Sequence, residues 1–270
     1  MNRPDIIAIA NEKGGVMKTT LTVHAADYQR RCRQAVLVID MDTQNSASQF
    51  LEKNRFGQYI GDLQSYLNHD IQVPPPDPGN TRDRIHYLSA GAFLKGLEKR
   101  DMRDCVRLLA PIATIAGYDW ILIDTAPGDS NKLHAALAIA NYVIIPSLFD
   151  EMSHQGVYKV TNNVIKLARD NTYDDLIPGG CNPVPVAIVP TGINNANKKQ
   201  VNRILALSET PLGGFTTNTY LSIRPVIGEA MHNHVSVWEV DSGDPRYAKK
   251  EMNDLMAELF TRIISLGAGQ

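Results

Sequence analysis

The sequence contains few cysteines, few aromatic residues and no excess of either charge. The 270 residues include three cysteines, Cys32, Cys105 and Cys181, and no C-x-x-C pair, so the sequence predicts neither a disulfide framework nor a zinc site. A formal net charge of -2 excludes a generally basic coat for nucleic acid, so any DNA contact must come from a local patch. The sequence shows no apolar run long enough to span a bilayer and no signal peptide, and we expect a cytoplasmic protein.

What is present is a repeated alternation of apolar strand signals and helical stretches. We expect strands at 5–10, 35–39, 85–88, 120–123, 142–146 and 184–189, and a last one within 215–223. Helices are expected at 18–33, 44–54, 94–109, 131–140, 153–169, 194–208 and 246–266. Fully apolar runs are typical of strands buried on both faces of a parallel sheet. The pattern predicts a single α/β domain over residues 1–270, with a doubly wound, mostly parallel sheet flanked by helices and a stiff connector at 74–79.

The clearest motif is a glycine-containing loop at residues 11–20, Asn-Glu-Lys-Gly-Gly-Val-Met-Lys-Thr-Thr, which follows the first apolar run. A strand, such a loop and a Lys-Thr pair opening a helix build a phosphate cradle, because backbone N–H groups and the helix N-terminus converge on an anion. In that cradle Lys18 would reach the outer phosphates and Thr19 would ligate Mg²⁺. The match to G-x-x-x-x-G-K-[ST] is incomplete, since Glu12 and Met17 replace its glycines.

Two acidic motifs follow later apolar strands. Asp40 and Asp42, two residues apart at a strand end, point the same way, so near a Mg²⁺-nucleotide they could order the metal's water shell and orient an attacking water. Asp124 ends the apolar run Trp120–Ile123 in a Walker B arrangement, in which the carboxylate reaches Mg²⁺, usually through water. Each pattern alone also fits a solvated aspartate, and the combination with the loop favours a nucleotide site.

Lys13, five residues before Lys18, makes the loop resemble the deviant Walker motif of the ParA/MinD family of dimerising ATPases. The resemblance implies that Lys13 crosses a dimer interface to the partner's nucleotide, that Asp42 positions the hydrolytic water and that Asp40 supports the metal shell. It implies catalytic roles for Lys13, Lys18 and Asp42, and metal contacts at Thr19, Asp40 and Asp124. ATP contacts are implied at Lys13, Gly14, Gly15, Val16, Met17, Lys18, Thr19, Thr20, Pro190 and Thr191.

The likeness covers most of the chain. Residues 88–98 resemble the family's strand-to-helix segment ending in G-L-E, and residues 140–146 resemble its A-D-x-V-x-I-P strand. The resemblance is greatest to short ParA-type plasmid partition proteins. It implies ATP and Mg²⁺ as ligands, a homodimer formed on ATP binding, non-specific DNA binding at the nucleoid, and a centromere-binding adaptor that stimulates hydrolysis.

The chain departs from the family pattern at Met17, where glycine is usual, and at Thr43, where proline is usual. A non-glycine residue forced to positive φ costs roughly 1 kcal/mol or more. The phosphate cradle survives unchanged if Met17 keeps a negative φ, and nucleotide affinity falls if it does not. We expect ATP to bind and turnover to be slow. Glu12 is adjacent to Lys13 and either pairs with it or is solvated.

Candidate DNA contacts lie on the helix after residue 194 and near the C-terminus, although each could be an ordinary solvated charge. They are Lys198, Lys199, Arg203, Arg224, Arg246, Lys249 and Lys250. The C-terminal helix, by contrast, has an apolar face but a largely acidic polar face. Membrane-surface helices favour Lys and Arg there, so we expect this helix to pack on the sheet and the protein to have no membrane partner.

Three other functions share features of this sequence, and the last of them is disfavoured by the positions of the cysteines. One is a related positioning ATPase for a protein or membrane cargo, and another is a slow or non-hydrolysing nucleotide switch. The third is an electron-transfer reductase, since nitrogenase iron proteins share the deviant loop. Those proteins ligate a [4Fe–4S] cluster through a cysteine shortly after the Walker B aspartate, whereas no cysteine follows Asp124 before Cys181.

Overall fold

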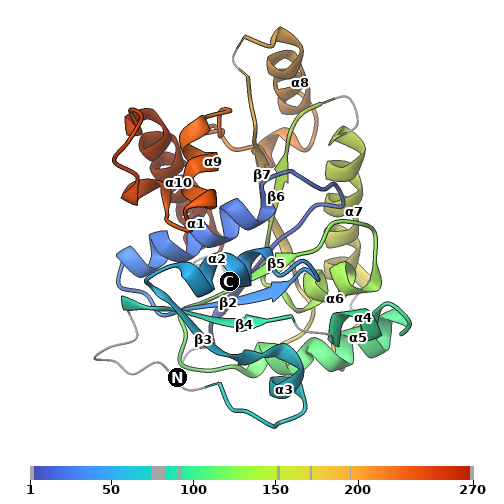
Figure 1. Cartoon of the computed structure of the whole chain (residues 1–270). Helices are drawn as coiled ribbons and strands as arrows, with labels where there is room; N and C mark the ends of the chain where they lie inside the picture. The colour runs from blue at the N-terminus through green and yellow to red at the C-terminus, as the bar shows by residue number, and fades with distance from the viewer. Residues whose placement is uncertain are drawn as a thin grey trace.

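The part of the chain that the structure describes is built around a seven-stranded parallel sheet of order β3-β4-β2-β5-β1-β6-β7 (Figure 1). This computed structural model describes residues 3–73, 83–90, 93–150, 153–170, 172–194 and 196–267. The strands are β1 (Asp5–Ile9), β2 (Val36–Met41), β3 (Gly57–Asp62), β4 (Ile85–Ser89), β5 (Trp120–Thr125), β6 (Tyr142–Ser147) and β7 (Val184–Pro190). The predicted doubly wound α/β fold is confirmed.

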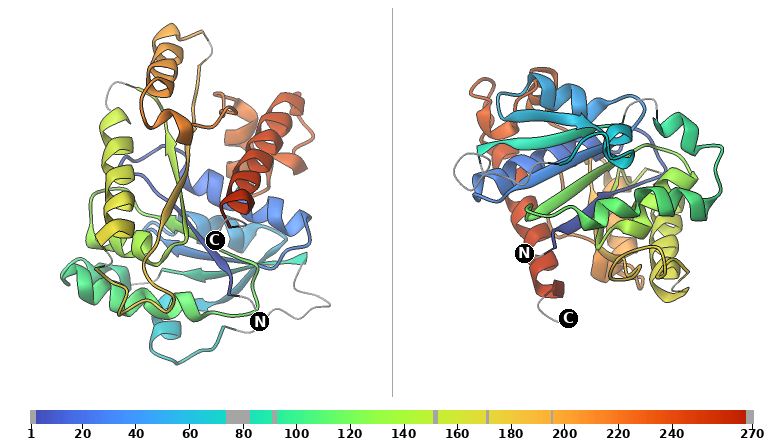
Figure 2. Two further views of the ribbon diagram at one scale, coloured as in Figure 1. Left: turned by 180° about the vertical axis from the view of Figure 1, so that it is seen from behind. Right: turned by 90° about the horizontal axis from the view of Figure 1, so that it is seen from below.

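Helices cover both faces of this sheet. They are α1 (Lys18–Arg31), α2 (Ser46–Lys53), α3 (Leu63–Leu67), α4 (Phe93–Leu97), α5 (Met102–Leu109), α6 (Asn131–Ile139), α7 (Ser153–Asp170), α8 (Lys198–Ser208), α9 (Pro225–His232) and α10 (Arg246–Gly267). Figures 1 and 2 show α1, α2, α9 and α10 on one side of the sheet and α4 to α7 on the other, with α8 beyond the end of β7. None of the described helices is long and apolar enough to cross a membrane.

The sheet divides the apolar core into two clusters because alternate residues of a strand face opposite sides. Ile6 and Ala8 of β1 join the cluster formed with α4 to α7. Ile7 and Ile9 join the cluster formed with α1, α2, α9 and α10. Burial on both faces is the reason that the central strands β2 and β5 have continuously apolar runs. The apolar face of α10 is buried in the second cluster, as its sequence predicted.

Several expected boundaries are wrong. The helix expected at 94–109 is two helices, because the Asp101 side chain caps α5 by accepting the N–H of Asp104. The helix expected from residue 194 begins at Lys198, since Asn197 caps it. The strand expected within 215–223 is reduced to two isolated bridges, Ile188 to Thr216 and Ile193 to Ser222. The connector at 74–79 lies outside the described residues.

Candidate nucleotide-binding site

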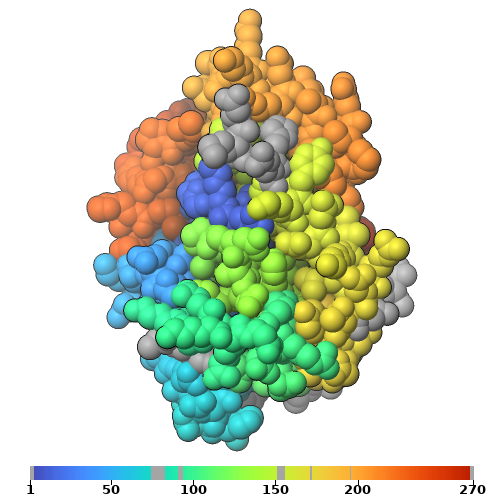
Figure 3. All heavy atoms as spheres, turned by 90° about the vertical axis from the view of Figure 1, so that its right-hand side faces the viewer, coloured from blue at the N-terminus to red at the C-terminus, as the bar shows by residue number. Residues whose placement is uncertain are grey.

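The loop between β1 and α1 leaves the carboxyl end of a central strand, flanked by β5 and β6. Ligands of open parallel sheets bind at this edge. In the loop, Gly15 has a φ of 74°, a conformation open to glycine, and Val16 is fully buried. Figure 3 shows dark blue atoms from the beginning of the chain at the molecular surface, between orange and green segments from much later in the sequence. The loop is therefore fixed to the core by Val16 and accessible from solvent at Gly14 and Gly15.

Met17 occupies the left-handed region, with φ 69° and ψ 29°. Of the two backbone states considered for this position, the structure shows the strained one. A side chain in this region costs roughly 1 kcal/mol or more relative to glycine. The Met17 side chain is partly buried and packs against the cluster that contains α1, so contact with the core offsets part of this cost.

The Lys18 side chain lies inside the loop, and the residue is only 7% exposed. Its ammonium group donates to the backbone oxygens of Asn11 at 3.1 Å and Lys13 at 2.9 Å. Burial lowers the pKa of Lys18, while the carboxylates of Asp124 and Asp42 oppose that shift. The loop thus encloses the ammonium group of Lys18, and phosphate binding by this lysine stays a prediction.

Asp124, at the carboxyl end of β5, receives two hydroxyl groups from α1. Thr19 Oγ1 donates to Asp124 Oδ2 at 2.7 Å, and Thr22 Oγ1 donates to Asp124 Oδ1 at 3.2 Å. The structure thus brings together Thr19 and Asp124, two of the predicted metal contacts, and their role in binding a metal stays a prediction. Thr22 was not anticipated, although its position three residues after Thr19 on the same helix could have indicated it.

Asp40 and Asp42 have different surroundings at the end of β2. The Asp40 side chain is fully buried and accepts the backbone N–H groups of Asp42 at 3.0 Å and Ser48 at 2.8 Å. The Asp42 side chain is partly exposed and, among the bonds found in the described chain, accepts only the N–H of Gln44, at 2.9 Å. Asp40 is therefore a buried support for the loop after β2, and Asp42 is the more accessible carboxylate.

The donors gathered here fit Mg²⁺. That ion uses one or two carboxylates, completes its octahedron with water and phosphate oxygens, and does not need a cage of protein ligands. Thr19 supplies a hydroxyl and Asp124 supplies a carboxylate beside the loop, with Asp40 adjacent on the next strand. Within the described residues no group of three or more His, Cys, Asp or Glu side chains could hold a metal by itself. The arrangement thus suits a metal that arrives with a nucleotide.

Lys13 does not pair with Glu12. Its ammonium group forms an ion pair with Asp150, in the segment between β6 and α7, and its backbone N–H donates to Asn11 Oδ1 at 2.9 Å. Glu12 instead contacts Lys159 of α7, with 3.3 Å between Oε2 and Nζ. The sequence gave no signal for Asp150, because the contact joins segments 137 residues apart.

Pro190 and Thr191 lie at the end of β7, close to the loop. The Thr191 hydroxyl donates to the backbone oxygen of Val16 at 3.1 Å, and the backbone N–H of Thr191 donates to the backbone oxygen of Ser147 at 2.8 Å. The backbone oxygen of Pro190 accepts the N–H of Leu221 at 2.9 Å. The expected adenine strand therefore contacts the phosphate loop directly. Adenine contacts themselves remain a prediction.

The basic residues near the C-terminus already have carboxylate partners. The pairs are Arg224 with Glu251, Arg246 with Asp244, Lys249 with Asp241 and Lys250 with Asp254. On α8 the situation differs. Lys198 and Lys199 are exposed and form no ion pair with any described residue, and Arg203 donates to the backbone oxygen of Phe149 at 3.3 Å. The structure thus favours α8 over the C-terminal segment as a surface for phosphate contacts.

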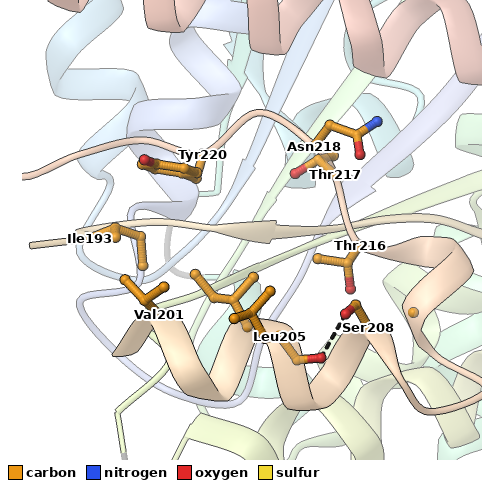
Figure 4. A pocket seen from close by; sticks show the side chains of 10 residues that line it. Ile193, Val201, Leu205, Ser208, Thr216, Thr217, Asn218 and Tyr220 are labelled. Atoms are coloured by element: carbon orange, nitrogen blue, oxygen red, sulfur yellow. Dashed lines mark hydrogen bonds between the residues drawn. The ribbon is translucent and has the colours of Figure 1, made fainter. Parts of the chain in front are cut away.

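A mainly apolar groove of about 390 Å³ runs between α8 and the segment 216–220 (Figure 4). Val201 and Leu205 of α8 point into it from one side and Tyr220 lies on the other. Leu205 is 58% exposed. The groove is separate from the phosphate loop, whose residues do not line it.

Comparison with known proteins agrees with this geometry. A family model described as "AAA domain" matches residues 4–177. The protein IncC of Escherichia coli is 27% identical over 263 residues, covering 95% of this chain and 69% of IncC. The chromosome-partitioning ATPase Soj of Thermus thermophilus is 30% identical over 155 residues, covering 56% of this chain and 57% of Soj.

Solved structures share the fold across nearly the whole chain. A protein assigned to plasmid partition in Borrelia burgdorferi B31, bound to AMPPNP, has a TM-score of 0.70 at 19% identity and covers 97% of this chain and 99% of its own. The structure of pNOB8 ParA bound to nonspecific DNA has a TM-score of 0.61 at 19% identity, with the same two coverages.

The fold and the loop together define a nucleotide-binding protein of the P-loop class. The chain belongs to the AAA domain family matched over residues 4–177, and its relatives place it among the partition ATPases of the ParA/MinD type. A P-loop ATPase of this family implies a nucleotide and Mg²⁺ as ligands.

Proposed function

We propose that this protein is a weak, partner-stimulated ATPase, acting as one domain over residues 1–270, that converts ATP and water to ADP and phosphate and drives plasmid or chromosome partition. The observation that carries the proposal is the grouping of Lys18, Thr19 and Asp124 around one loop at the carboxyl edge of the sheet, with Lys13 beside it. A lysine, a hydroxyl group and a carboxylate around one loop are the groups that binding of a Mg²⁺-nucleotide requires.

Each side chain has a role in this proposal. Lys18 and the N–H groups of residues 14–20 bind the outer phosphates, because they present positive charge at a helix N-terminus. Thr19 and Asp124 hold Mg²⁺, with Asp40 in support, and the ion neutralises charge on the phosphates. Asp42 is accessible at the end of β2 and orients the attacking water. Pro190 and Thr191 line the adenine side.

The homodimer depends on Lys13. When ATP is bound, Lys13 leaves Asp150 and contacts the triphosphate of a second copy, so that the two subunits close around both nucleotides. The dimer then binds DNA without sequence preference through Lys198 and Lys199, and a centromere-binding adaptor stimulates hydrolysis and release at the nucleoid. The DNA-bound structure of pNOB8 ParA supports the DNA step.

Sedimentation velocity and phosphate release test the proposal. We expect the parent to be a dimer with ATP and Mg²⁺ and a monomer with ADP, and we expect Lys13→Ala to bind ADP but stay monomeric with ATP. Lys159→Ala is the matched control, since it removes a neighbouring lysine that contacts Glu12. If Lys13→Ala dimerises and hydrolyses ATP as the parent does, the coupling of ATP to dimer formation is wrong.

A second candidate is a nucleotide switch with little or no hydrolysis. The left-handed conformation of Met17 favours it, because backbone strain lies where the loop must approach phosphate. Phosphate release with and without DNA and the adaptor separates the two. Turnover under any of these conditions supports the ATPase, and none under all of them supports the switch.

A further inference from the structure

Asn11, the first residue of the loop, is completely buried and makes contacts in two directions. Its side-chain Nδ2 donates to the backbone oxygen of Pro146 in β6 at 2.7 Å, and its Oδ1 accepts the N–H of Lys13 at 2.9 Å. Its backbone oxygen accepts Lys18 Nζ. One residue therefore contacts both loop lysines and the strand next to the loop.

Gly156, in the first turns of α7, closes the other side of Asn11. A Cβ placed on Gly156 would lie 2.9 Å from Asn11 Oδ1, a distance that real Cβ atoms essentially never show. The φ of Gly156 is not in the left-handed region, so lack of space and not backbone conformation favours glycine here. Asp150, the ion-pair partner of Lys13, lies between Pro146 and Gly156 along the chain. The Asn11 amide thus fills the space between the loop and the segment that holds Lys13.

We infer that Asn11 is a positioning residue for Lys13, and that Gly156 is required because it makes room for the Asn11 amide. Asn11 Oδ1 holds the backbone at Lys13, and Asn11 Nδ2 holds Pro146 in the strand that leads to Asp150, so one amide sets the direction in which Lys13 leaves the loop. This inference rests on the proposed function, in which Lys13 acts on a second copy of the chain.

Two variants disturb the amide from opposite sides. Asn11→Ala removes both side-chain bonds, whereas Gly156→Ala keeps Asn11 and pushes on its Oδ1. Gly228→Ala in α9 is the matched control, because nothing lies within 4 Å of a Cβ there. Each protein is titrated with fluorescent ADP and Mg²⁺, its dimer formation with ATP is followed by sedimentation, and kcat and KM for ATP are measured.

Since Lys13 is proposed to act only in the dimer that forms with ATP, we expect both variants to bind ADP as the parent does. Dimer formation with ATP should weaken by about tenfold, the effect of losing or distorting the one Asn11 bond that acts on Lys13, and kcat should fall more than KM changes. Gly228→Ala should match the parent in every assay. Gly156→Ala keeps the test decisive if Asn11→Ala does not fold.

Two results would overturn the inference. In one, both variants dimerise with ATP as well as the parent. In the other, ADP binding and thermal stability fall in step with dimer formation, which is the signature of a purely structural residue. A parent protein that does not dimerise with ATP would refute the proposed function and this inference together. Sedimentation of the parent protein alone, before any variant is measured, shows whether this is the case.

Discussion

Asp40 on β2 and Asp124 on β5 are register partners in adjacent parallel strands, and both residues are completely buried. Burial raises the pKa of Asp124 to about 7, and the charge of Asp40 adds to the rise. Burial also raises the pKa of Asp40, against the N–H groups of Ser48 and Asp42. Two neighbouring buried carboxylates are unfavourable, and the charge of Lys18 offsets only part of the rise in the pKa of Asp124, so a further cation would be stabilising. The local cost is typical of a functional site.

Replacing Asp124 with asparagine should therefore stabilise the protein in the absence of Mg²⁺. The folded carboxyl has a higher pKa than the unfolded one, so the folded state binds more protons and the free energy of unfolding falls as pH rises from about 4 to about 7. We expect Asp124→Asn to raise the free energy of unfolding at pH 8 by roughly 2–4 kcal/mol. Urea unfolding at pH 4.5 and 8 measures it, with Asp70→Asn, at an exposed position, as control. A lower stability of Asp124→Asn at pH 8 would contradict the argument.

Met17→Gly should tighten nucleotide binding. Glycine adopts the observed φ of 69° without the cost of a Cβ, which is about 1 kcal/mol, or roughly a fivefold gain in affinity if the strain limits binding. Met17→Ala is the informative control, because it keeps the Cβ and loses only the packing of the side chain. Calorimetric titration with ADP and Mg²⁺ compares the three proteins. Equal affinities for the glycine and alanine variants would show that backbone strain does not affect binding.

His24 should make the protein less stable in acid. Its ring is fully buried, with Nδ1 2.7 Å from the oxygen of Thr20, while Nε2 accepts the N–H of Val237 at 3.0 Å. Burial lowers the pKa of His24, although Thr20 and Asp27 oppose the shift. The stabilisation is complete above the unfolded pKa of about 6.5 and is lost as pH falls towards the folded value.

We expect the parent to lose about 1–2 kcal/mol relative to His24→Gln between pH 7.5 and 5. Taking the difference between the two proteins removes the contribution of Asp124, which has the opposite sign over the same range. Urea unfolding in a pH series provides the measurement. A difference that does not change with pH would mean that His24 is not held neutral in the folded state.

Lys198 and Lys199 should contribute to DNA affinity, and Lys250 should not. The first two form no ion pair with a described residue, whereas Lys250 pairs with Asp254. For each lysine that contacts a phosphate, the slope of log affinity against log salt should decrease by about 0.9 when it is changed to alanine. Fluorescence anisotropy with unrelated DNA duplexes at several salt concentrations, in the presence of ATP, tests this. An unchanged slope for Lys198→Ala/Lys199→Ala would place the DNA contacts elsewhere.

The elements found from the sequence are those with a strong local signal. β2 and β5 are continuously apolar because both faces are buried, and the glycine loop is defined by its own residues. β3 was missed because it is an edge strand with a polar sequence, and its Tyr59 is 56% exposed. α9 was missed because it is a short helix of eight residues that follows an irregular segment. A polar edge strand and a short helix after an irregular segment both lack a long periodic pattern, so local sequence signals do not find them.

Within the site, the sequence identified residue types but not their partners. The Lys18 and Thr19 positions follow from the loop motif, and the structure brings Thr19 to Asp124. The register that places Asp40 beside Asp124 depends on which strands are neighbours, and this is a property of the whole sheet. The contact of Lys13 with Asp150 joins distant segments for the same reason. Long-range pairing requires the fold itself.

The internal pairing of the C-terminal cations has a consequence for how a polyanion could be held. Three basic candidates form no ion pair with a carboxylate of the described residues: Lys198, Lys199 and Arg203. All three belong to α8, which projects past the end of β7 (Figure 1). A DNA duplex would therefore contact one helix, α8, and not a broad basic surface. A contact surface of this size gives a single subunit low affinity for DNA. Stable binding would then require the α8 helices of two subunits to contact the duplex together, and dissociation of the dimer would be enough to release the DNA.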